Sequence, residues 1–261
     1  MIHDEKALVL EHRDVGAGYR FLRLKSPRIA ADLMPGQFVH VRVPTLEASA
    51  LRRPFSVFDA VGDEVTVLYK NVGRGTAALN RVGEGETLPV LGPLGHGFPL
   101  KCGGEALMVG GGFGVAPLYF LARKFAEAAG MPRPRLFVGG RTKDDLLALD
   151  RFEQLGVEIQ VATNDGSAGV KGLVTDPLDE ALSELRHRGR AFELFACGPE
   201  GMLRAVAMRA TGTGSKGWIS MDRRMICGVG ACYACIQKTV RGNSRCCIEG
   251  PVFAAEDLVW D

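Results

Sequence analysis

The sequence contains no run of eighteen or more apolar residues, which is about the length that a helix needs to cross a bilayer. Its charge is also nearly balanced, because 32 lysines and arginines face 30 acidic residues and leave a formal net charge of +2. No dense basic stripe is present, and Arg186-His187-Arg188 with Arg190 reads as the solvated end of a helix. These absences argue against a membrane protein and against a nucleic-acid-binding protein.

Acid–base and nucleophilic catalysts are missing as well, since the sequence shows no paired carboxylates and no Ser/His/Asp arrangement. We expect each of the scattered histidines to be structural or solvated: His3, His12, His40, His96 and His187. The first residues, Met-Ile-His-Asp-Glu-Lys, contain no apolar secretory core. We therefore expect a cytoplasmic protein whose cysteines are thiols or metal ligands.

The most informative feature is a group of cysteines near the C-terminus. Cys227, Cys232 and Cys235 are spaced C-x4-C-x2-C, and Cys247 follows after eleven residues in Cys-Ile-Glu-Gly-Pro. This is the plant-type spacing for a [2Fe–2S] cluster, and thiolates are soft ligands that suit iron–sulfur centres. The two glycines of the first gap let the backbone approach such a cluster closely. The pattern therefore predicts a one-electron carrier.

Three other interpretations of these cysteines remain open from the spacing. They could hold a structural zinc, although zinc sites usually pair their cysteines in two knuckles. They could form disulfides, or they could be free core thiols. Cys246 stands beside Cys247, and because adjacent side chains point in different directions, one of the two should ligate while the other packs. Cys102 and Cys197 lie far away in the sequence and are not counted as ligands.

The first 102 residues are expected to form an antiparallel β-barrel or sandwich. Short runs rich in Val, Leu, Phe and Tyr alternate there with Gly, Pro and Asp. The expected strands are Ala7–Glu11, Tyr19–Leu24, Gln37–Val43, Pro54–Ala60, Val65–Tyr69 and Leu88–Leu91, with a short helix over Thr76–Val82.

From residue 103 onward strands alternate with helices, which is typical of a parallel α/β sheet. The expected strands are Ala106–Val109, Leu136–Gly139, Val157–Ala162 and Glu193–Cys197. The expected helices are Ala116–Ala129, Asp144–Leu155, Asp176–Arg188 and Glu200–Ala210. A linker over Thr211–Gly217 should lead to the small cysteine module. We therefore expect an α+β multidomain protein with divisions at 1–102, 103–214 and 215–261.

Two motifs of the α/β region should face one crevice, because ligands of open α/β sheets bind beyond the carboxyl ends of the strands. The first is the glycine run Gly110–Gly114, between a strand and a helix, where phosphates bind. It is also consistent with a plain tight turn, and Val115 stands where the strict G-x-G-x-x-G pattern has its third glycine. The second is Cys197-Gly198-Pro199, whose cysteine could equally be a buried small thiol.

Two motifs of the first region could bind a diphosphate and a flat ring. In Arg52-Arg53-Pro54-Phe55-Ser56, an arginine with a neighbouring hydroxyl can clamp a diphosphate, and Phe55 can lie against a ring. In Val72-Gly73-Arg74-Gly75-Thr76, the start of a helix offers free N–H groups. Taken singly, these residues would more often be a surface arginine, a packing residue and an N-cap.

In this order, the motifs resemble those of the ferredoxin–NADP reductase superfamily, in which an FAD-binding barrel precedes a nicotinamide-binding domain. Its flavin motif, Arg-x-Tyr/Phe-Ser, matches Arg53-Pro54-Phe55-Ser56. The whole chain is similar to the electron-transfer subunits of NAD-linked dihydroorotate dehydrogenases. The most specific part of this resemblance is Gly-Ala-Cys-Tyr-Ala-Cys, residues Gly230–Cys235.

The resemblance implies a role for each matched residue. FAD would be bound by Arg53, Pro54, Phe55, Ser56, Leu68, Tyr69, Lys70, Gly75 and Thr76. NAD would be bound by Gly111, Gly112, Gly114, Cys197, Gly198 and Pro199. The cluster would be held by Cys227, Cys232, Cys235 and Cys247, since the family's last ligand precedes one residue and then Asp/Glu-Gly-Pro. The doubled cysteine at 246 and 247 departs from the family's usual pattern.

A nicotinamide exchanges two electrons and a [2Fe–2S] cluster one, and a flavin can join them. The resemblance implies a relay from an FMN-containing dihydroorotate dehydrogenase catalytic subunit to NAD, in a heterotetramer that serves pyrimidine biosynthesis. One alternative is a subunit of a ferredoxin–NADP-type transhydrogenase or a hydrogenase diaphorase. Another is a binding protein with a structural zinc. For the choice of NAD over NADP, Arg141, Asn164 and Asp165 could contact a ribose or merely end strands and turn the chain.

Overall fold

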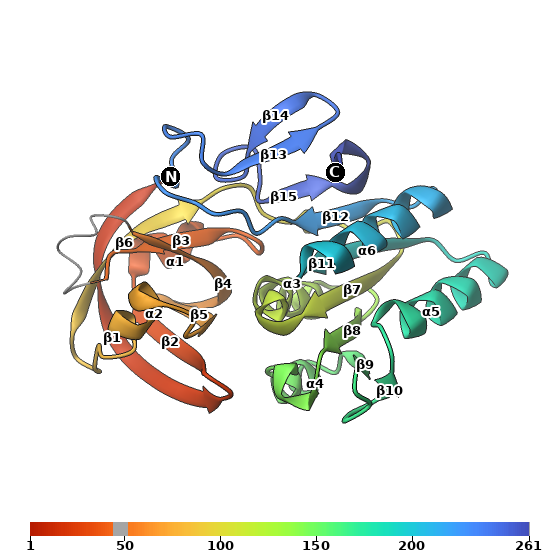
Figure 1. The fold of residues 1–261 in the computed structure, drawn as a ribbon, viewed down its shortest axis with the longest axis horizontal. Coiled ribbons are helices and arrows are strands. Elements are labelled where there is room, and N and C mark those ends of the chain that lie inside the picture. Colours follow the sequence, from red (N-terminus) through yellow and green to blue (C-terminus); the bar gives the residue numbers. More distant parts are fainter. Residues whose placement is uncertain (44–51, 261) are drawn as a thin grey trace.

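The computed structural model describes residues 1–43 and 52–260. Figure 1 shows a red-to-yellow barrel beside a green-to-blue sheet with helices, and a blue C-terminal segment that lies over both. Within the described residues, no helix is long and apolar enough to span a membrane.

The N-terminal part is a closed barrel with the strand order β1-β2-β5-β4-β3-β6, in which neighbouring strands are antiparallel. Closure leaves no unpaired sheet edge. Alternate residues such as Val39, Val41 and Val57 fill the interior. The strands are β1 (His3–Gly16), β2 (Tyr19–Lys25), β3 (Phe38–Val41), β4 (Arg53–Val61), β5 (Glu64–Lys70) and β6 (Thr87–Leu94), and the helices are α1 (Pro27–Asp32) and α2 (Arg74–Leu79). The predicted barrel is confirmed.

The second part is a sheet with the strand order β10-β9-β8-β7-β11-β12-β15, in which β15 alone runs antiparallel among the described strands. The apolar run of β7 is buried on both faces, as expected for a central parallel strand. The strands are β7 (Glu105–Gly111), β8 (Arg135–Gly140), β9 (Glu158–Thr163), β10 (Val170–Lys171), β11 (Phe192–Cys197), β12 (Gly217–Ser220) and β15 (Val252–Ala254). The helices are α3 (Val115–Glu127), α4 (Leu149–Gln154), α5 (Thr175–His187) and α6 (Glu200–Thr213). The predicted parallel α/β part is confirmed.

The barrel and the sheet share a packed interface through α3. The Tyr119 ring of α3 stacks on the Phe58 ring of β4, with 4.3 Å between the ring centroids. Residues of both parts, including Phe21, Leu68 and Phe195, belong to one buried cluster. The site described below therefore lies between two bodies that share a continuous core.

Two local predictions were wrong. The single helix expected over Asp144–Leu155 is a 3-10 turn, Lys143–Asp145, followed by α4, and Ala148 between them has a left-handed φ of 54°. Thr142 caps the start of the 3-10 turn by accepting the N–H of Asp144, and the break comes after that turn, where Leu146 is extended and Ala148 is left-handed. The expected linker over Thr211–Gly217 is the last turn of α6, a Gly214 cap with φ 68°, and the start of β12.

The C-terminal residues are not a separate layer. β12 and β15 both extend the central sheet, and the chain between them forms a long excursion that carries the hairpin of β13 (Ile236–Thr239) and β14 (Gly242–Arg245). This arrangement differs from a division at residue 214, because strands after that residue complete the sheet of the α/β part. The cysteine loop is consequently anchored in the sheet at both ends.

Candidate functional site

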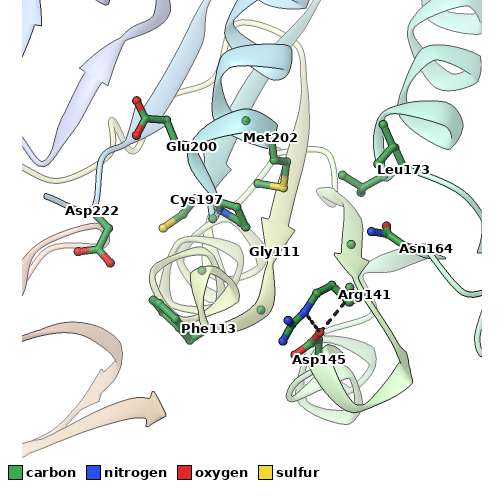
Figure 2. A pocket seen from close by; sticks show the side chains of 18 of the residues that line it. Gly111, Phe113, Arg141, Asp145, Asn164, Leu173, Cys197, Glu200, Met202 and Asp222 are labelled. Carbon is green, nitrogen blue, oxygen red and sulfur yellow. Dashed lines mark hydrogen bonds and ion pairs between the residues drawn. The ribbon is translucent and has the colours of Figure 1, made fainter. Parts of the chain in front are cut away.

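A cavity of about 790 Å³ opens at the carboxyl ends of β7, β8 and β11. The two motifs predicted to face one crevice both line it: Gly111, Gly112, Gly114, Cys197, Gly198 and Pro199. Figure 2 shows Gly111 and Cys197 on neighbouring strand ends, with Arg141 and Asp145 across the cavity. The structure therefore brings all six predicted nucleotide-binding residues together.

Glycine is required at this cavity by close packing of the two motifs. A Cβ at Gly114 would overlap the carbonyl of Cys197, and one at Gly111 would lie 2.7 Å from Cδ of Pro199. Gly112 has a φ of +55°, which few side chains tolerate. The glycine run is thus a tight turn that also lines the cavity. The two interpretations of the run, a plain tight turn and a phosphate-binding turn, are therefore compatible.

Cys197 is buried at this cavity, and its thiol stays protonated. Burial raises the pKa of Cys197 to about 12, with a hydrogen bond to Ser220 acting against the rise and the charge of Asp222 adding to it. Burial likewise raises the pKa of Asp222, which lines the same cavity, and Arg223 opposes that rise. Because a protonated thiol is a poor nucleophile, Cys197 contributes to the cavity only its packing surface and a weak hydrogen-bond donor.

The cavity is also lined by polar residues, of which Asp145 and Glu200 were not predicted from the sequence. Asp145 accepts the backbone N–H of Arg141 at 3.2 Å and its Nε at 3.4 Å, and burial opposes but does not cancel the lowering of the Asp145 pKa by these bonds. Lys70, expected beside the flavin, lies at the cavity with its Nζ 3.2 Å from the Tyr19 hydroxyl and 3.9 Å from Asp145. The two Lys70 contacts join residues far apart in sequence, so no local pattern predicts them. The cavity-lining residue Met202 was missed as well.

The residues predicted to clamp a diphosphate lie close together in the barrel. Arg53 of β4 lies against the first turn of α2, where a Cβ at Gly75 would come 2.5 Å from its Nε. The Thr76 hydroxyl accepts the N–H groups of Val72 and Gly73 at 2.9 and 3.1 Å and so orders that turn. An arginine fork beside a helix start is an arrangement that suits a diphosphate.

The other predicted flavin residues occupy different sides of their strands. Phe55 points into the barrel, and its ring centroid lies 5.4 Å from that of Tyr69. Leu68 points the other way, into the interface between barrel and sheet. Ser56 is half-buried and pairs with Phe38 of β3, while Pro54 pairs with His40. Their roles toward FAD stay predictions.

The four predicted cluster ligands form two pairs of thiols in contact. Cys227 contacts Cys232, and Cys235 contacts Cys247. Among the described residues, no three His, Cys, Asp or Glu side chains converge as they would around one metal ion. Two pairs suit two iron atoms better than one zinc, whose four ligands converge on a single point.

Backbone N–H groups face the sulfurs, as a cluster loop requires. The Gly230 N–H donates to Sγ of Cys247 at 3.2 Å. Although burial raises the pKa of Cys227, hydrogen bonds from the backbone of Val229, Cys232 and Ala231 outweigh it and lower the pKa to about 7. At Cys227 these bonds favour the thiolate, the form that binds metal, whereas burial raises the pKa of Cys247 to about 12.

Cys247 and Cys246 are separated as the sequence required. Both cysteines are buried in one core cluster. Cys247 contacts Cys235 and its sulfur accepts the Gly230 N–H, whereas the backbone N–H of Cys246 donates to the Cys235 carbonyl at 2.8 Å. Burial raises the pKa of both thiols to about 12, so the two cysteines differ in their contacts and not in their pKa. This geometry favours Cys247 as the fourth ligand and Cys246 as a packing residue.

The residues present therefore fit three groups. The thiol pairs fit a [2Fe–2S] cluster, the Arg53–Gly75 contact fits the diphosphate of FAD, and the glycine-floored cavity fits a nicotinamide dinucleotide. Fold and site together define an electron-transfer oxidoreductase of the ferredoxin-reductase type with an added iron–sulfur loop.

Comparison with known proteins specifies the family. Residues 222–259 match the model of the iron–sulfur cluster binding domain of dihydroorotate dehydrogenase B, and residues 108–208 match the oxidoreductase NAD-binding domain. The dihydroorotate dehydrogenase B (NAD(+)) electron transfer subunits of Bacillus cereus (strain Q1) and Bacillus anthracis (strain CDC 684 / NRRL 3495) are each 39% identical to this chain, over 99% of it and 100% of their own length. The chain belongs to this family of electron transfer subunits.

Solved structures agree with the fold. The structure of an NADH-dependent reduced ferredoxin-NADP oxidoreductase, from work on flavin-based electron bifurcation, is 30% identical, with a TM-score of 0.85 over 98% of this chain and 91% of that one. The ferredoxin reductase of carbazole 1,9a-dioxygenase is 24% identical, with a TM-score of 0.68 over 82% of this chain and 67% of that one. The second likeness concerns the fold alone.

Proposed function

We propose that this chain is the electron-transfer subunit of an NAD-linked dihydroorotate dehydrogenase. It would pass electrons between an FMN-containing catalytic partner subunit and NAD, by way of a [2Fe–2S] cluster and FAD. One observation carries the proposal. The thiols of the cysteine loop form two pairs, Cys227 with Cys232 and Cys235 with Cys247, and the loop packs against both the barrel and the nucleotide-binding sheet. The name of the relatives that are 39% identical over their full length supports it.

When bound, the nicotinamide would exchange a hydride with the flavin, the flavin would exchange electrons in pairs or singly, and the cluster would carry one electron at a time. The residues of this chain bind and orient these groups. Arg53 and the start of α2 hold a diphosphate, Gly111 to Gly114 receive a dinucleotide, and the four thiols hold iron. No acid–base step is required of the protein, which agrees with the protonated Cys197 at the cavity.

The partner would dock near the cluster loop. Ile226, Val229 and Tyr233 lie on this loop and expose 39%, 43% and 63% of their surfaces. Exposed apolar side chains of this size mark interaction surfaces when they gather. We propose a heterotetramer of two catalytic and two electron-transfer chains, acting in the cytoplasm in pyrimidine biosynthesis.

The test is made on the full chain, purified anaerobically. We expect a coloured protein with FAD, about two irons and two acid-labile sulfides per chain, and NADH should bleach both the flavin and the cluster bands. Addition of the catalytic partner should then allow dihydroorotate to reduce NAD. A colourless protein that contains zinc would refute the proposal, as would dihydroorotate oxidation by this chain alone.

A second candidate function has a specific observation in its favour. The 30% identity to the NADH-dependent reduced ferredoxin-NADP oxidoreductase extends over nearly the whole chain. This chain could therefore serve a transhydrogenase-type complex with a different partner. Co-purification decides between them, because a dihydroorotate-oxidising partner supports the first function and a glutamate-synthase-like or hydrogenase subunit supports the second.

A further inference from the structure

His40 lies in the middle of β3 and is completely buried, with 0% of its surface exposed. Its neighbours Val39 and Val41 point into the barrel core, so Phe38 and His40 point outward. Phe38 packs in the same cluster as Cys235 and Cys247. Figure 1 shows the segment between β12 and β13 passing over the end of the barrel that carries β3 and β6. The outward face of β3 is therefore covered by the cysteine loop.

The polar edge of the His40 ring faces this loop. A Cβ built on Gly228 would lie 2.6 Å from Cε1, 2.8 Å from Nδ1 and 3.0 Å from Nε2 of His40. Both nitrogens and the carbon between them are thus aimed at the residue that follows Cys227. Gly228 also has a φ of +71°, so glycine is required there both by its conformation and by the ring.

Neither nitrogen of His40 has a hydrogen-bond partner among the described residues, although both are buried. A buried polar atom left in this way destabilises the fold, because it gives up its hydrogen bonds to water without replacement. The other four histidines have such partners: His3 with Asp32, His12 with Val82 and Tyr69, His96 with Ile248, and His187 with Ser183. His40 consequently departs from the expectation that every histidine here is structural or solvated.

We propose that His40 is a positioning residue that donates a ring N–H hydrogen bond to a sulfur of the cluster and thereby raises the cluster's reduction potential. The inference rests on the proposed function. Sulfur is the acceptor that the loop side supplies once iron is bound, and hydrogen bonds to the sulfurs help to set the potential of such clusters. Reduction adds negative charge, so a donor at this place favours the reduced form.

The surroundings keep the ring in the form that this role needs. Burial, and then the charges of Arg52 and Arg53, lower the pKa of His40 to about 4. The ring is therefore neutral, with one N–H donor and one lone pair. Because Arg53 belongs to the diphosphate clamp and Gly228 to the cluster loop, His40 lies between the parts of the chain that would hold the two groups.

The direct test is pulsed EPR on the reduced full chain, prepared anaerobically with its flavin and cluster and labelled with ¹⁵N-histidine. We expect a ¹⁵N coupling to the cluster spin that disappears in His40→Gln, whose donor is an unlabelled amide. His96→Gln is the matched control, because His96 lies beside Ile248 on the cluster loop but its Nδ1 is already bonded to the Ile248 carbonyl at 2.6 Å. The coupling should survive in this control.

The second test measures the potentials of the cluster and of the flavin separately in the same protein. At a fixed solution potential, His40→Leu should lower the ratio of reduced to oxidised cluster about tenfold, as expected for the loss of about 1.4 kcal/mol. The flavin should be unchanged, and His40→Gln should restore part of the cluster shift because its amide can donate.

Each remaining outcome contradicts the inference. These outcomes are an absent coupling, a coupling lost in His96→Gln, an unchanged cluster potential, and a shift confined to the flavin. If His40→Leu fails to take up iron, the labelled wild-type protein still gives the answer. A preparation without acid-labile sulfide would refute the proposed function, whereas an intact cluster without a His40 coupling would refute this inference alone.

Discussion

The nucleotide cavity and the cysteine loop are built by opposite means. The cavity is shaped by backbone: glycines bring two strand ends together, and side chains such as that of Cys197 supply surface without charge. The loop is shaped by side chains, because its thiols meet in pairs and the backbone turns its N–H groups toward them. A cavity for an exchangeable ligand needs room and shape, whereas a resident metal centre needs ligands in fixed places.

This difference decides how each region should respond to substitution. In the loop, one atom of one side chain carries the function, so even an isosteric change should be severe at a ligand and mild next to it. In the cavity, adding an atom should do more harm than removing one. Single substitutions in the two regions test this contrast.

The largest effect is expected at the adjacent cysteines. Cys247→Ser should lose most of its iron and labile sulfide, because an alcohol is a poor replacement for a thiolate ligand. Cys246→Ser is the matched control and should keep its cluster, at a cost of about 1–3 kcal/mol for a hydroxyl in an apolar site. Iron and sulfide analysis with urea unfolding measures both. A Cys246→Ser protein without cluster would reverse the assignment.

Gly114→Ala should be the most damaging change in the cavity. Its Cβ would overlap the Cys197 carbonyl, so the two motifs must separate, and we expect a loss of more than about 2 kcal/mol of stability with weaker NADH binding. Gly212→Ala provides the contrast, since nothing lies within 4 Å of its Cβ in α6, and it should gain about 0.5–1 kcal/mol. Thermal unfolding and NADH titration would show both; equal behaviour would remove packing as the reason for glycine.

Arg53→Met should weaken FAD binding by about 10- to 100-fold, which corresponds to about 1.5–3 kcal/mol for hydrogen bonds to a charged group. Arg52→Met removes a neighbouring arginine that pairs with Asp4 at 2.9 Å, and it should leave FAD affinity nearly unchanged. Flavin fluorescence during titration of the apoprotein gives both constants. If the two variants lost FAD equally, Arg53 would have no special place in the clamp.

The smallest effect is expected at Arg141, whose side chain is 80% exposed and paired with Asp145. Arg141→Ala should change the KM for NADH less than about fivefold, since an exposed pair contributes at most about 1 kcal/mol. Arg133→Ala is the control, because Arg133 precedes the start of β8, at the end of the strand away from the cavity, and this substitution should leave the KM for NADH unchanged. A rise in KM for NADPH that exceeds the rise for NADH would show instead that Arg141 binds a 2′-phosphate.

The sequence predicted the architecture well where the signal is local. The barrel strands, the alternating α/β part and the ligand spacing follow from periodicity, turn residues and cysteine count. The helix predicted over residues 144–155 is interrupted because Leu146 is extended and Ala148 has a left-handed backbone, which periodicity does not detect. The linker failed because β12 is short and gains its stability from pairing with β11 and β15.

The sequence predicted which residues line the site better than it predicted which of them contact one another. The six cavity residues were found because both motifs end parallel strands. Lys70, Asp145 and Tyr19 meet through the docking of the barrel on the sheet, which leaves no trace in local sequence. The direction of Phe55 depends on the phase of β4 in the closed barrel, and the isolation of His40 depends on a loop nearly 190 residues further on, at Gly228.

The cysteine loop runs between β12 and β15, the last two strands at one edge of the sheet. Iron binding to the loop should therefore affect the stability of this edge. β15 is only three residues long and follows the last ligand by five positions, so a change in the shape of the loop acts directly on a short strand that pairs with β12. If iron is scarce and the loop loosens, β12 becomes a bare edge with unpaired backbone groups, which is a template for self-association. We therefore expect iron-starved cells to accumulate aggregates of this chain, so that iron has a part in its solubility as well as in its redox chemistry.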